Sequence, residues 1–258
     1  MNGAGAFGAS PFTIVVVAWI ALAIVLVPFQ LRFTPPTGRF ARPGWGPTMP
    51  VRAGRMIMEG VFLLLFAGLF LAGGTPKTAP MWVIFAAWVA HAVNRSVIFP
   101  LRERSAGKRM PVAIVATGAA FNAVNATLNG LWLGSLSPAY SVDWLLDTRF
   151  HIGLAVFLIG ATINHRADDR LLALRRPGGA DYSVPKGGFF RYVSCPNHFG
   201  EIVEWAGFAV MCWNLPALSL ALWTAARLIP RSLSVHRWYR AHFPDYPANR
   251  RAVIPFVL

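Results

Sequence analysis

The chain has 258 residues, of which 55% are hydrophobic and only 13% are charged. Soluble domains carry about twice that share of charged residues, so the composition excludes an ordinary soluble globular protein. The net charge of +14 is typical of nucleic-acid binders, but the basic residues lie between apolar runs, where membrane orientation accounts for most of them. We therefore expect an integral membrane protein without a nucleic-acid partner.

Apolar runs that approach or reach the roughly 20 residues needed to cross a bilayer recur along the chain. We predict spans at residues 12–31, 56–71, 81–100, 111–133 and 150–164, followed by a pair within 199–228. Asn214-Leu215-Pro216 interrupts the last run, and because asparagine and proline favour turns, we divide it into two short helices. The sequence thus predicts an all-α, polytopic bundle of seven transmembrane helices in a single membrane-embedded domain, residues 1–258.

The connecting segments alternate between rich and poor in arginine and lysine. Those after the first, third, fifth and last spans are rich, whereas the second connection has only Lys77 and the sixth is uncharged. Because cytoplasmic loops carry an excess of basic residues, we expect the N-terminus outside and the C-terminus in the cytoplasm. The excess of arginine over lysine favours a bacterial source, and hence the inner membrane; in a eukaryote the expected membrane is the endoplasmic reticulum.

Several polar side chains lie inside the predicted spans, where charges are costly and usually functional. They are Glu59, His91, Asn94, Arg95, Asn122, Asn125, Asn129, Asn164, Glu201 and Glu204. Structural roles are open alternatives: Arg95 and Glu59 could form an ion pair, the asparagines could join helices, and the glutamates of the sixth span could favour a helix N-terminus. Their position beside the basic loops indicates instead a site for an anionic ligand, because guanidinium groups bind phosphate bidentately.

Several segments of the second half form a specific set of motifs. They are Asn164-His165-Arg166-Ala167-Asp168, Asp181-Tyr182-Ser183-Val184-Pro185-Lys186-Gly187-Gly188, Pro196-Asn197-His198-Phe199-Gly200-Glu201 and Phe243-Pro244-Asp245-Tyr246-Pro247. Together they resemble the C-terminal half of the steroid 5-alpha-reductase family, from about residue 147 to the end. The N-terminal half is similar more loosely, through Glu59 and His91-Ala92-Val93-Asn94-Arg95.

The resemblance implies NADPH-dependent reduction of a carbon–carbon double bond conjugated to a ketone, in a lipid substrate. It also implies that the cofactor lies inside the helix bundle, mainly against residues 147–258, and not in a Rossmann fold. By matching position, the implied NADPH contacts are Arg95, Asn164, Asp168, Arg175, Tyr182, Asn197, Glu201, Arg231 and Tyr239. The residue types agree, since arginines suit phosphates and the other polar groups suit ribose hydroxyls and the carboxamide.

Glu59 matches the catalytic acid of the family. When hydride reaches the β-carbon of an enone, negative charge develops on the carbonyl oxygen, and one donor aimed at that oxygen is typically worth about 3–4 kcal/mol. A carboxyl group in an apolar span favours its neutral form and therefore keeps a proton to donate. We expect Glu59 to polarise the substrate carbonyl in this way.

The chain departs from the family at two positions near this acid. Met58 replaces the usual glutamine before the glutamate, and Ala92 replaces the usual tyrosine after His91. Either Glu59 acts alone or with His91 or a water, or the substrate is not a steroid 3-ketone. The leading expectation is a 3-keto-4-ene steroid bound by Met58, His91, Ala92, Phe121 and Trp205.

Two other functions are alternatives. Pro196-Asn197-His198 faintly resembles membrane methyltransferases that use S-adenosylmethionine, but that cofactor carries no phosphate, and the arginine excess argues against it. A transporter would place ionisable groups in paired broken helices at the bilayer midplane, which this sequence lacks. Cys195 and Cys212 form no zinc or redox motif, so we expect no metal.

Overall fold

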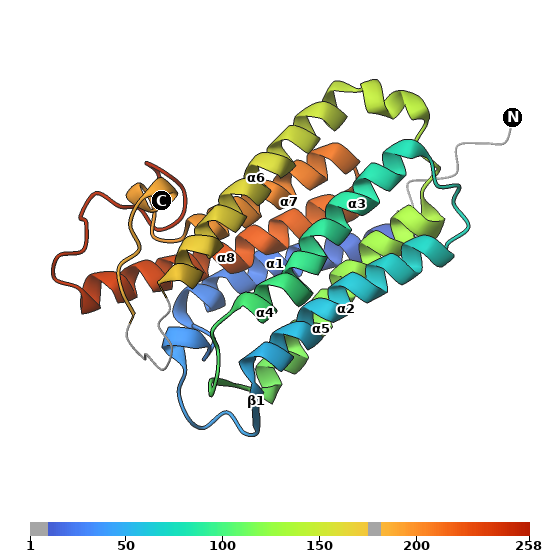
Figure 1. Cartoon of the computed structure of the whole chain (residues 1–258). Coiled ribbons are helices and arrows are strands. Elements are labelled where there is room, and N and C mark those ends of the chain that lie inside the picture. Colours follow the sequence, from blue (N-terminus) through green and yellow to red (C-terminus); the bar gives the residue numbers. More distant parts are fainter. Residues whose placement is uncertain (1–9, 175–181) are drawn as a thin grey trace, which may run out of the picture.

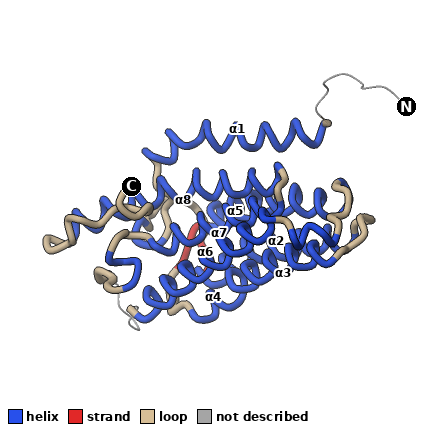
Figure 2. Tube along the Cα trace, turned by 90° about the horizontal axis from the view of Figure 1, so that it is seen from above, coloured by secondary structure: helices blue, strands red, loops and turns tan. Residues whose placement is uncertain are grey.

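The computed structural model describes residues 10–174 and 182–258, and nearly all of its regular structure is helical (Figure 1). The helices are α1 (Pro11–Arg32), α2 (Val51–Ala72), α3 (Ala79–Val93), α4 (Phe99–Arg102), α5 (Val112–Leu131), α6 (Thr148–Ala173), α7 (Pro196–Cys212) and α8 (Leu215–His242). Two short strands, β1 (Thr48–Pro50) and β2 (Arg109–Pro111), pair antiparallel with Met49 opposite Met110. The long helices run side by side, and α1 lies on the outside of the bundle, packed on α8 (Figure 2).

Each predicted span overlaps helical structure, and the third covers α3, the π-helical turn after it and α4. Within residues 10–174 and 182–258, four helices are long and apolar enough to cross a membrane: α1, α2, the α3–α4 segment to Arg102, and α5 with its extension to Leu136. The predicted break near residue 214 is confirmed, because α7 ends before Trp213 in the left-handed region (φ 47°) and the Asn214 side chain caps α8 by accepting from the Ala217 amide at 2.9 Å. The count of seven spans and the orientation stay predictions.

The ends of α6 and α8 differ from the predicted ends of their spans. The apolar run of α6 was expected to stop at residue 164, but the helix continues to Ala173, and α8 continues past residue 228 to His242. These extra turns are polar and basic, so apolar runs underestimate both helices. They carry Asp168, Arg231 and Tyr239 on regular helix beyond the predicted spans.

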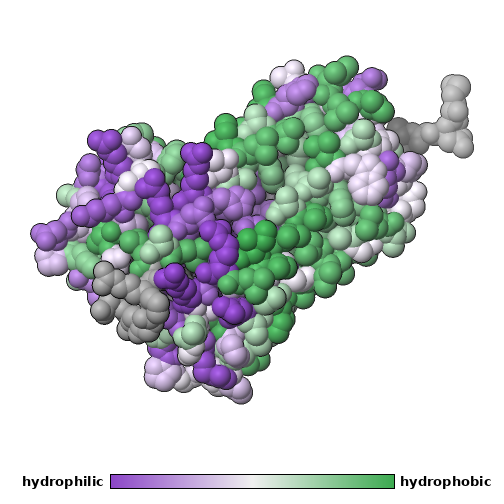
Figure 3. Space-filling view, viewed as in Figure 1, coloured by the Kyte–Doolittle hydropathy of each residue, from purple (hydrophilic) through white to green (hydrophobic). Residues whose placement is uncertain are grey.

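The outer surface of the helices is apolar. Val25 of α1, Leu64 of α2 and Ile159 of α6 are 70%, 72% and 56% exposed. In the space-filling view, hydrophobic side chains cover much of the bundle, and hydrophilic ones gather at the end formed by the long loops and the C-terminus (Figure 3). We call this the basic end. Apolar exposure on this scale fits contact with lipid and supports a membrane protein.

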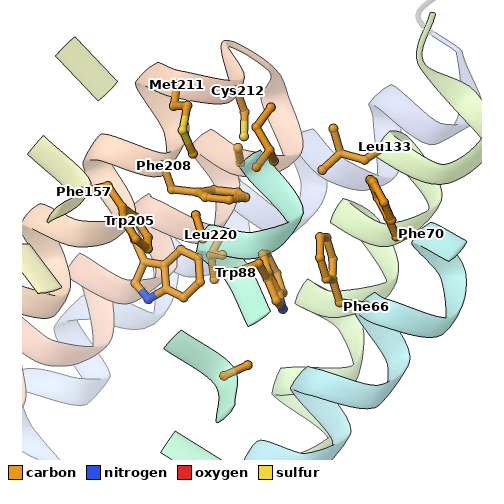
Figure 4. Packing of buried hydrophobic residues seen from close by; sticks show 14 of the residues in the cluster. Phe66, Phe70, Trp88, Leu133, Phe157, Trp205, Phe208, Met211, Cys212 and Leu220 are labelled. Atoms are coloured by element: carbon orange, nitrogen blue, oxygen red, sulfur yellow. The ribbon is translucent and has the colours of Figure 1, made fainter. Parts of the chain in front are cut away.

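An aromatic core of buried side chains lies between α2, α3, α6, α7 and α8 (Figure 4). The fully buried Trp88 of α3 stacks between Phe62 and Phe66 of α2, with ring centroids 4.2 and 4.1 Å away. Phe208 of α7 meets the Trp88 ring edge-on at 5.6 Å. This core ties α2, α3 and α7 together, and the polar site residues follow it toward the basic end.

Helices α6 and α7 pack with their backbones in direct contact, at glycines spaced seven residues apart on both helices. A Cβ atom on Gly160 would lie 2.2 Å from the Glu204 amide nitrogen, and one on Gly200 would lie 2.4 Å from the Asn164 nitrogen. Gly153 and Gly207 make the same kind of approach one repeat away. Small residues allow such contact between membrane helices. This contact brings the polar residues of α6 beside those of α7.

Candidate functional site

A buried polar cluster joins α3, α6 and α7 near the basic end. Arg95 lies in the π-helical turn 94–98 and donates from Nη1 to Asp168 Oδ2 at 3.0 Å, while its Nη2 lies 4.0 Å from Glu201 Oε2. One helical turn from Arg95, His91 Nδ1 lies 2.8 Å from Glu204 Oε1. Three residues that the resemblance assigned to the cofactor, Arg95, Asp168 and Glu201, are therefore brought together, although they are far apart in the sequence.

Glu59 of α2 lies beside Asn122 of α5. The Asn122 amide donates to Glu59 Oε2 at 3.4 Å and to the Met58 carbonyl oxygen at 2.8 Å. Among the residues that the structure describes, Arg95 pairs with Asp168 and Glu201 and makes no ion pair with Glu59. The alternative of a Glu59–Arg95 pair is thus not supported, and Glu59 Oε1 makes no hydrogen bond to the part of the chain that the structure describes.

Glu201 and Glu204 do not serve the helix N-terminus, because the first turn of α7 contains no acidic residue. Instead Glu201 lies between two arginines, with Arg227 Nη2 of α8 3.8 Å from its Oε1. Glu204 is 1% exposed, and within the described residues its Oε2 has no hydrogen-bond partner. Both glutamates therefore belong to the polar cluster.

The asparagines differ in role. Asn164 of α6 donates to the Asn197 carbonyl oxygen of α7 at 2.9 Å, which brings two predicted cofactor residues into contact. Asn129 donates to the Pro216 carbonyl oxygen of α8 at 3.3 Å, and Asn125 accepts from the Trp19 indole of α1 at 3.3 Å. The interhelical role considered for the asparagines is therefore seen for Asn129 and also for Asn122, which joins α5 to α2 through the Met58 carbonyl oxygen and adjoins Glu59 as well.

A second group, the arginine–aromatic cluster, lies on the α8 side of the basic end and consists of Arg39, Tyr182, Trp238 and Tyr239. The guanidinium carbon of Arg39 lies 4.8, 4.7 and 4.4 Å from the ring centroids of Tyr182, Trp238 and Tyr239. Arg39 Nη2 donates to the Tyr239 hydroxyl at 3.2 Å, but its buried Nη1 has no partner within the described residues. A buried, unsatisfied guanidinium N–H group fits an anionic oxygen of a ligand.

The resemblance did not point to Arg39; only its place in the first basic loop could have drawn attention to it. Tyr182 and Tyr239, which the resemblance did imply, both contact its guanidinium group. The residues of this cluster come from the loop after α1, the segment after α6 and helix α8. No short sequence pattern can therefore predict that they meet.

Arg231 of α8 holds the segment after α1. Its Nη1 donates to the Pro35 carbonyl oxygen at 3.1 Å, and its Nη2 donates to the Thr37 carbonyl oxygen at 3.0 Å. Burial, and then the charge of Arg39, lower the pKa of Arg231 to about 10, so it stays charged at neutral pH. Two arginines thus lie near each other at the basic end, which favours an anion between them. Arg175, a further predicted cofactor residue, lies outside the described residues.

The residues expected to line the substrate site occupy different surroundings. Trp205 belongs to the aromatic core, with its ring 4.7 Å from that of His91, and Ala92 is fully buried in the same core. Phe121 packs instead on Trp223 of α8 at 5.3 Å. Met58 packs on Gly118 of α5. The structure therefore groups His91, Ala92 and Trp205, and it places Phe121 in a separate aromatic contact.

These features describe a helical protein with an apolar outer surface, a buried arginine–carboxylate cluster and an arginine–aromatic cluster. The family model described as 3-oxo-5-alpha-steroid 4-dehydrogenase matches residues 108–258. The steroid 5-alpha-reductase DET2 of Gossypium hirsutum is 35% identical over 250 residues, which cover 95% of this chain and 94% of the relative. The DET2 protein of Arabidopsis thaliana is 37% identical over 86% of this chain and 87% of its own length.

An animal relative gives a similar match: 3-oxo-5-alpha-steroid 4-dehydrogenase 1 of Bos taurus is 36% identical over 86% of this chain and 88% of its own length. The chain belongs to the steroid 5-alpha-reductase family, also described as 3-oxo-5-alpha-steroid 4-dehydrogenases. Membership confirms the predicted class, an oxidoreductase that acts on a CH–CH group, in a family that uses a nicotinamide cofactor. Family membership therefore favours a reductase over the methyltransferase and transporter alternatives.

Proposed function

We propose that the protein uses NADPH to reduce a carbon–carbon double bond conjugated to a ketone, and that a 3-keto-4-ene steroid is its substrate. The observation that carries this proposal is the pairing of Arg95 with Asp168 and Glu201 inside the bundle, within electrostatic range of Glu59. The family supports reduction of a steroid enone, and the names of the relatives refer to steroids.

The cofactor would bind across both clusters. Arg39, Arg231 and Arg175 would hold its phosphates, and the surplus of arginines favours NADPH, with its extra 2'-phosphate, over NADH. Arg95, Asn164, Asp168, Asn197 and Glu201 would bind ribose hydroxyls and the carboxamide, with Tyr182 and Tyr239 as aromatic walls. When bound, NADPH supplies the hydride for the reduction.

Glu59 would act as the acid at the substrate carbonyl. Because Asn122 donates to Oε2, a neutral carboxyl group of Glu59 would carry its proton on Oε1 and donate from there to a substrate. The Oε1 proton would then stabilise the negative charge that develops on the carbonyl oxygen.

His91 is the candidate for a second donor, because Ala92 offers no hydroxyl group. His91 Nδ1 is committed to Glu204, which leaves only Nε2 for a substrate or a bridging water. A substrate other than a steroid 3-ketone is the alternative proposal.

As part of the same proposal, the chain is one domain of seven spans. Its N-terminus lies outside and its basic end lies in the cytoplasm. The membrane is a bacterial inner membrane, or the endoplasmic reticulum if the source is eukaryotic.

We expect the purified protein to oxidise NADPH in the presence of a 3-keto-4-ene steroid such as progesterone, with a product two hydrogens heavier by mass spectrometry. Turnover should require NADPH and fall when NADH replaces it at equal concentration. NADPH should also raise the melting temperature, because a ligand that binds only the folded state stabilises it. If NADPH stabilises the protein but no product forms, the cofactor assignment stands and the steroid substrate is wrong. If NADPH neither stabilises the protein nor supports product formation, the proposed function is wrong.

Replacing Arg39 with alanine is expected to weaken NADPH binding by at least about tenfold, since a charge-assisted hydrogen bond is worth about 1.5–3 kcal/mol. The measurement is the NADPH dissociation constant from the shift in melting temperature. Arg42→Ala is the matched control, because Arg42 is exposed in the same loop and also lies over aromatic rings. Equal NADPH affinity in the two variants would remove Arg39 from the cofactor site.

A further inference from the structure

A second cationic pocket lies at the basic end, apart from both clusters. It has a volume of about 310 Å³ and is lined by Arg52, Lys108, Arg109 and the turn 105–107. Its frame is the β1–β2 pair, in which Arg109 Nε donates to the Thr48 hydroxyl at 2.8 Å and the Val51 amide donates to the Lys108 carbonyl oxygen at 3.1 Å. The pocket is therefore a defined concavity between the starts of α2 and α5.

The charge of the pocket is almost entirely positive. Glu103, the acidic residue of this loop, is 2% exposed, and its Oε2 lies 3.1 Å from Arg55 Nε. Arg52 donates one N–H group to the Glu103 carbonyl oxygen at 3.4 Å, and the exposed side chain of Lys108 makes no hydrogen bond or ion pair within the described part of the chain. Three cations with donors to spare favour a phosphate group, the multiply charged acceptor that best uses them.

The position of the pocket identifies the molecule that carries this phosphate. Two candidate membrane helices, α2 and α5, begin at the pocket, and a third ends at Arg102. Apolar side chains on these helices are exposed just beyond it: Ile57, Leu101 and Val112 are 48%, 56% and 40% exposed. A phosphate bound here lies at the boundary between water and hydrocarbon, where lipid headgroups are found, and acyl chains can follow the exposed apolar side chains.

We propose that this pocket binds the headgroup phosphate of an anionic phospholipid, with Arg52 and Lys108 as the principal contacts. Neither residue belongs to the proposed cofactor or substrate site. The lipid would hold α2 and α5 together at their amino-terminal ends and so fix the depth of the bundle in the membrane. Binding does not depend on the reductase function and can be measured without turnover.

The test is to titrate the detergent-purified protein with phosphatidylglycerol and, separately, with phosphatidylcholine, reading the melting temperature. Phosphatidylglycerol should stabilise the wild type more strongly. Each basic side chain near a lipid surface is worth about 1 kcal/mol, or about fivefold in affinity, so Arg52→Ala and Lys108→Ala should each weaken binding about fivefold. Arg166→Ala is the control, because it removes an exposed arginine of α6 and should leave the affinity unchanged.

Three outcomes would overturn the proposal. Equal stabilisation by the two lipids would remove the preference for an anionic headgroup. Equal affinity losses in Lys108→Ala and Arg166→Ala would show general charge attraction rather than a site. Full stabilisation by glycerol phosphate, which has the phosphate but no acyl chain, would assign the pocket to a soluble phosphate and reject the lipid.

Discussion

Replacing Glu59 with glutamine is expected to lower kcat by about 10²-fold or more while leaving NADPH binding nearly intact. Glutamine keeps the shape of the side chain, and its amide oxygen still accepts the Asn122 hydrogen bond. Its amide N–H group can still donate a hydrogen bond to the carbonyl oxygen of a substrate, but an amide is a far weaker acid than a carboxyl group and stabilises the developing negative charge less. The loss should therefore fall on the chemical step and not on folding or cofactor affinity.

The measurement is a single-turnover rate with saturating NADPH, together with the NADPH dissociation constant. Asp143→Asn is the control, because it makes the same isosteric change at an exposed carboxylate of the α5–α6 connection, outside both clusters. Unchanged kcat in Glu59→Gln would remove the proposed acid from the mechanism. Parallel losses of NADPH affinity and melting temperature would make Glu59 a structural residue.

Replacing Gly160 with alanine is expected to destabilise the protein by about 3 kcal/mol, at the upper end of the usual cost of overpacking. The added methyl group would lie 2.2 Å from the Glu204 amide nitrogen, and it meets backbone, which cannot rotate away as a side chain can. Helices α6 and α7 would have to separate. Because Asp168 and Glu201 sit on opposite sides of that contact, turnover should fall together with stability.

The measurement is the melting temperature in detergent, with Gly68→Ala as the control. Gly68 is also a helical glycine in the bundle, but a Cβ atom there would meet nothing within 4 Å. Alanine at Gly68 should be neutral or stabilising by up to about 1 kcal/mol, from helix propensity alone. Similar melting temperatures for the two variants would show that α6 and α7 are not packed as closely as described.

Should Gly160→Ala prevent folding altogether, Gly153→Ala offers a second variant of the same contact, since a methyl group there would lie 2.3 Å from the Met211 amide nitrogen. It acts in the part of α6 that is remote from Asp168. We expect it to lower the melting temperature in the same way. A stable, fully active Gly153→Ala protein would contradict the close approach of these backbones.

The sequence by itself determined the position of most helices, although not where α6 and α8 end. Apolar runs placed α1 to α5 to within a few residues, since lipid requires long uninterrupted helices. Asn214 and Pro216 correctly predicted the break between α7 and α8, because helix capping and turn formation depend only on neighbouring residues. The motifs from Asn164 to Glu201 were sufficient for the family, which the comparisons confirmed.

Only the tertiary structure decided which side chains meet. The partners of Arg95 come from α6 and α7, and the rings around Arg39 come from segments far along the chain. The seven-residue glycine spacing on α6 and α7 was visible in the sequence, but nothing local showed that the two sets face each other. Contacts of this kind depend on how helices cross and rotate, which is set by packing over the whole bundle and not by any short stretch of residues.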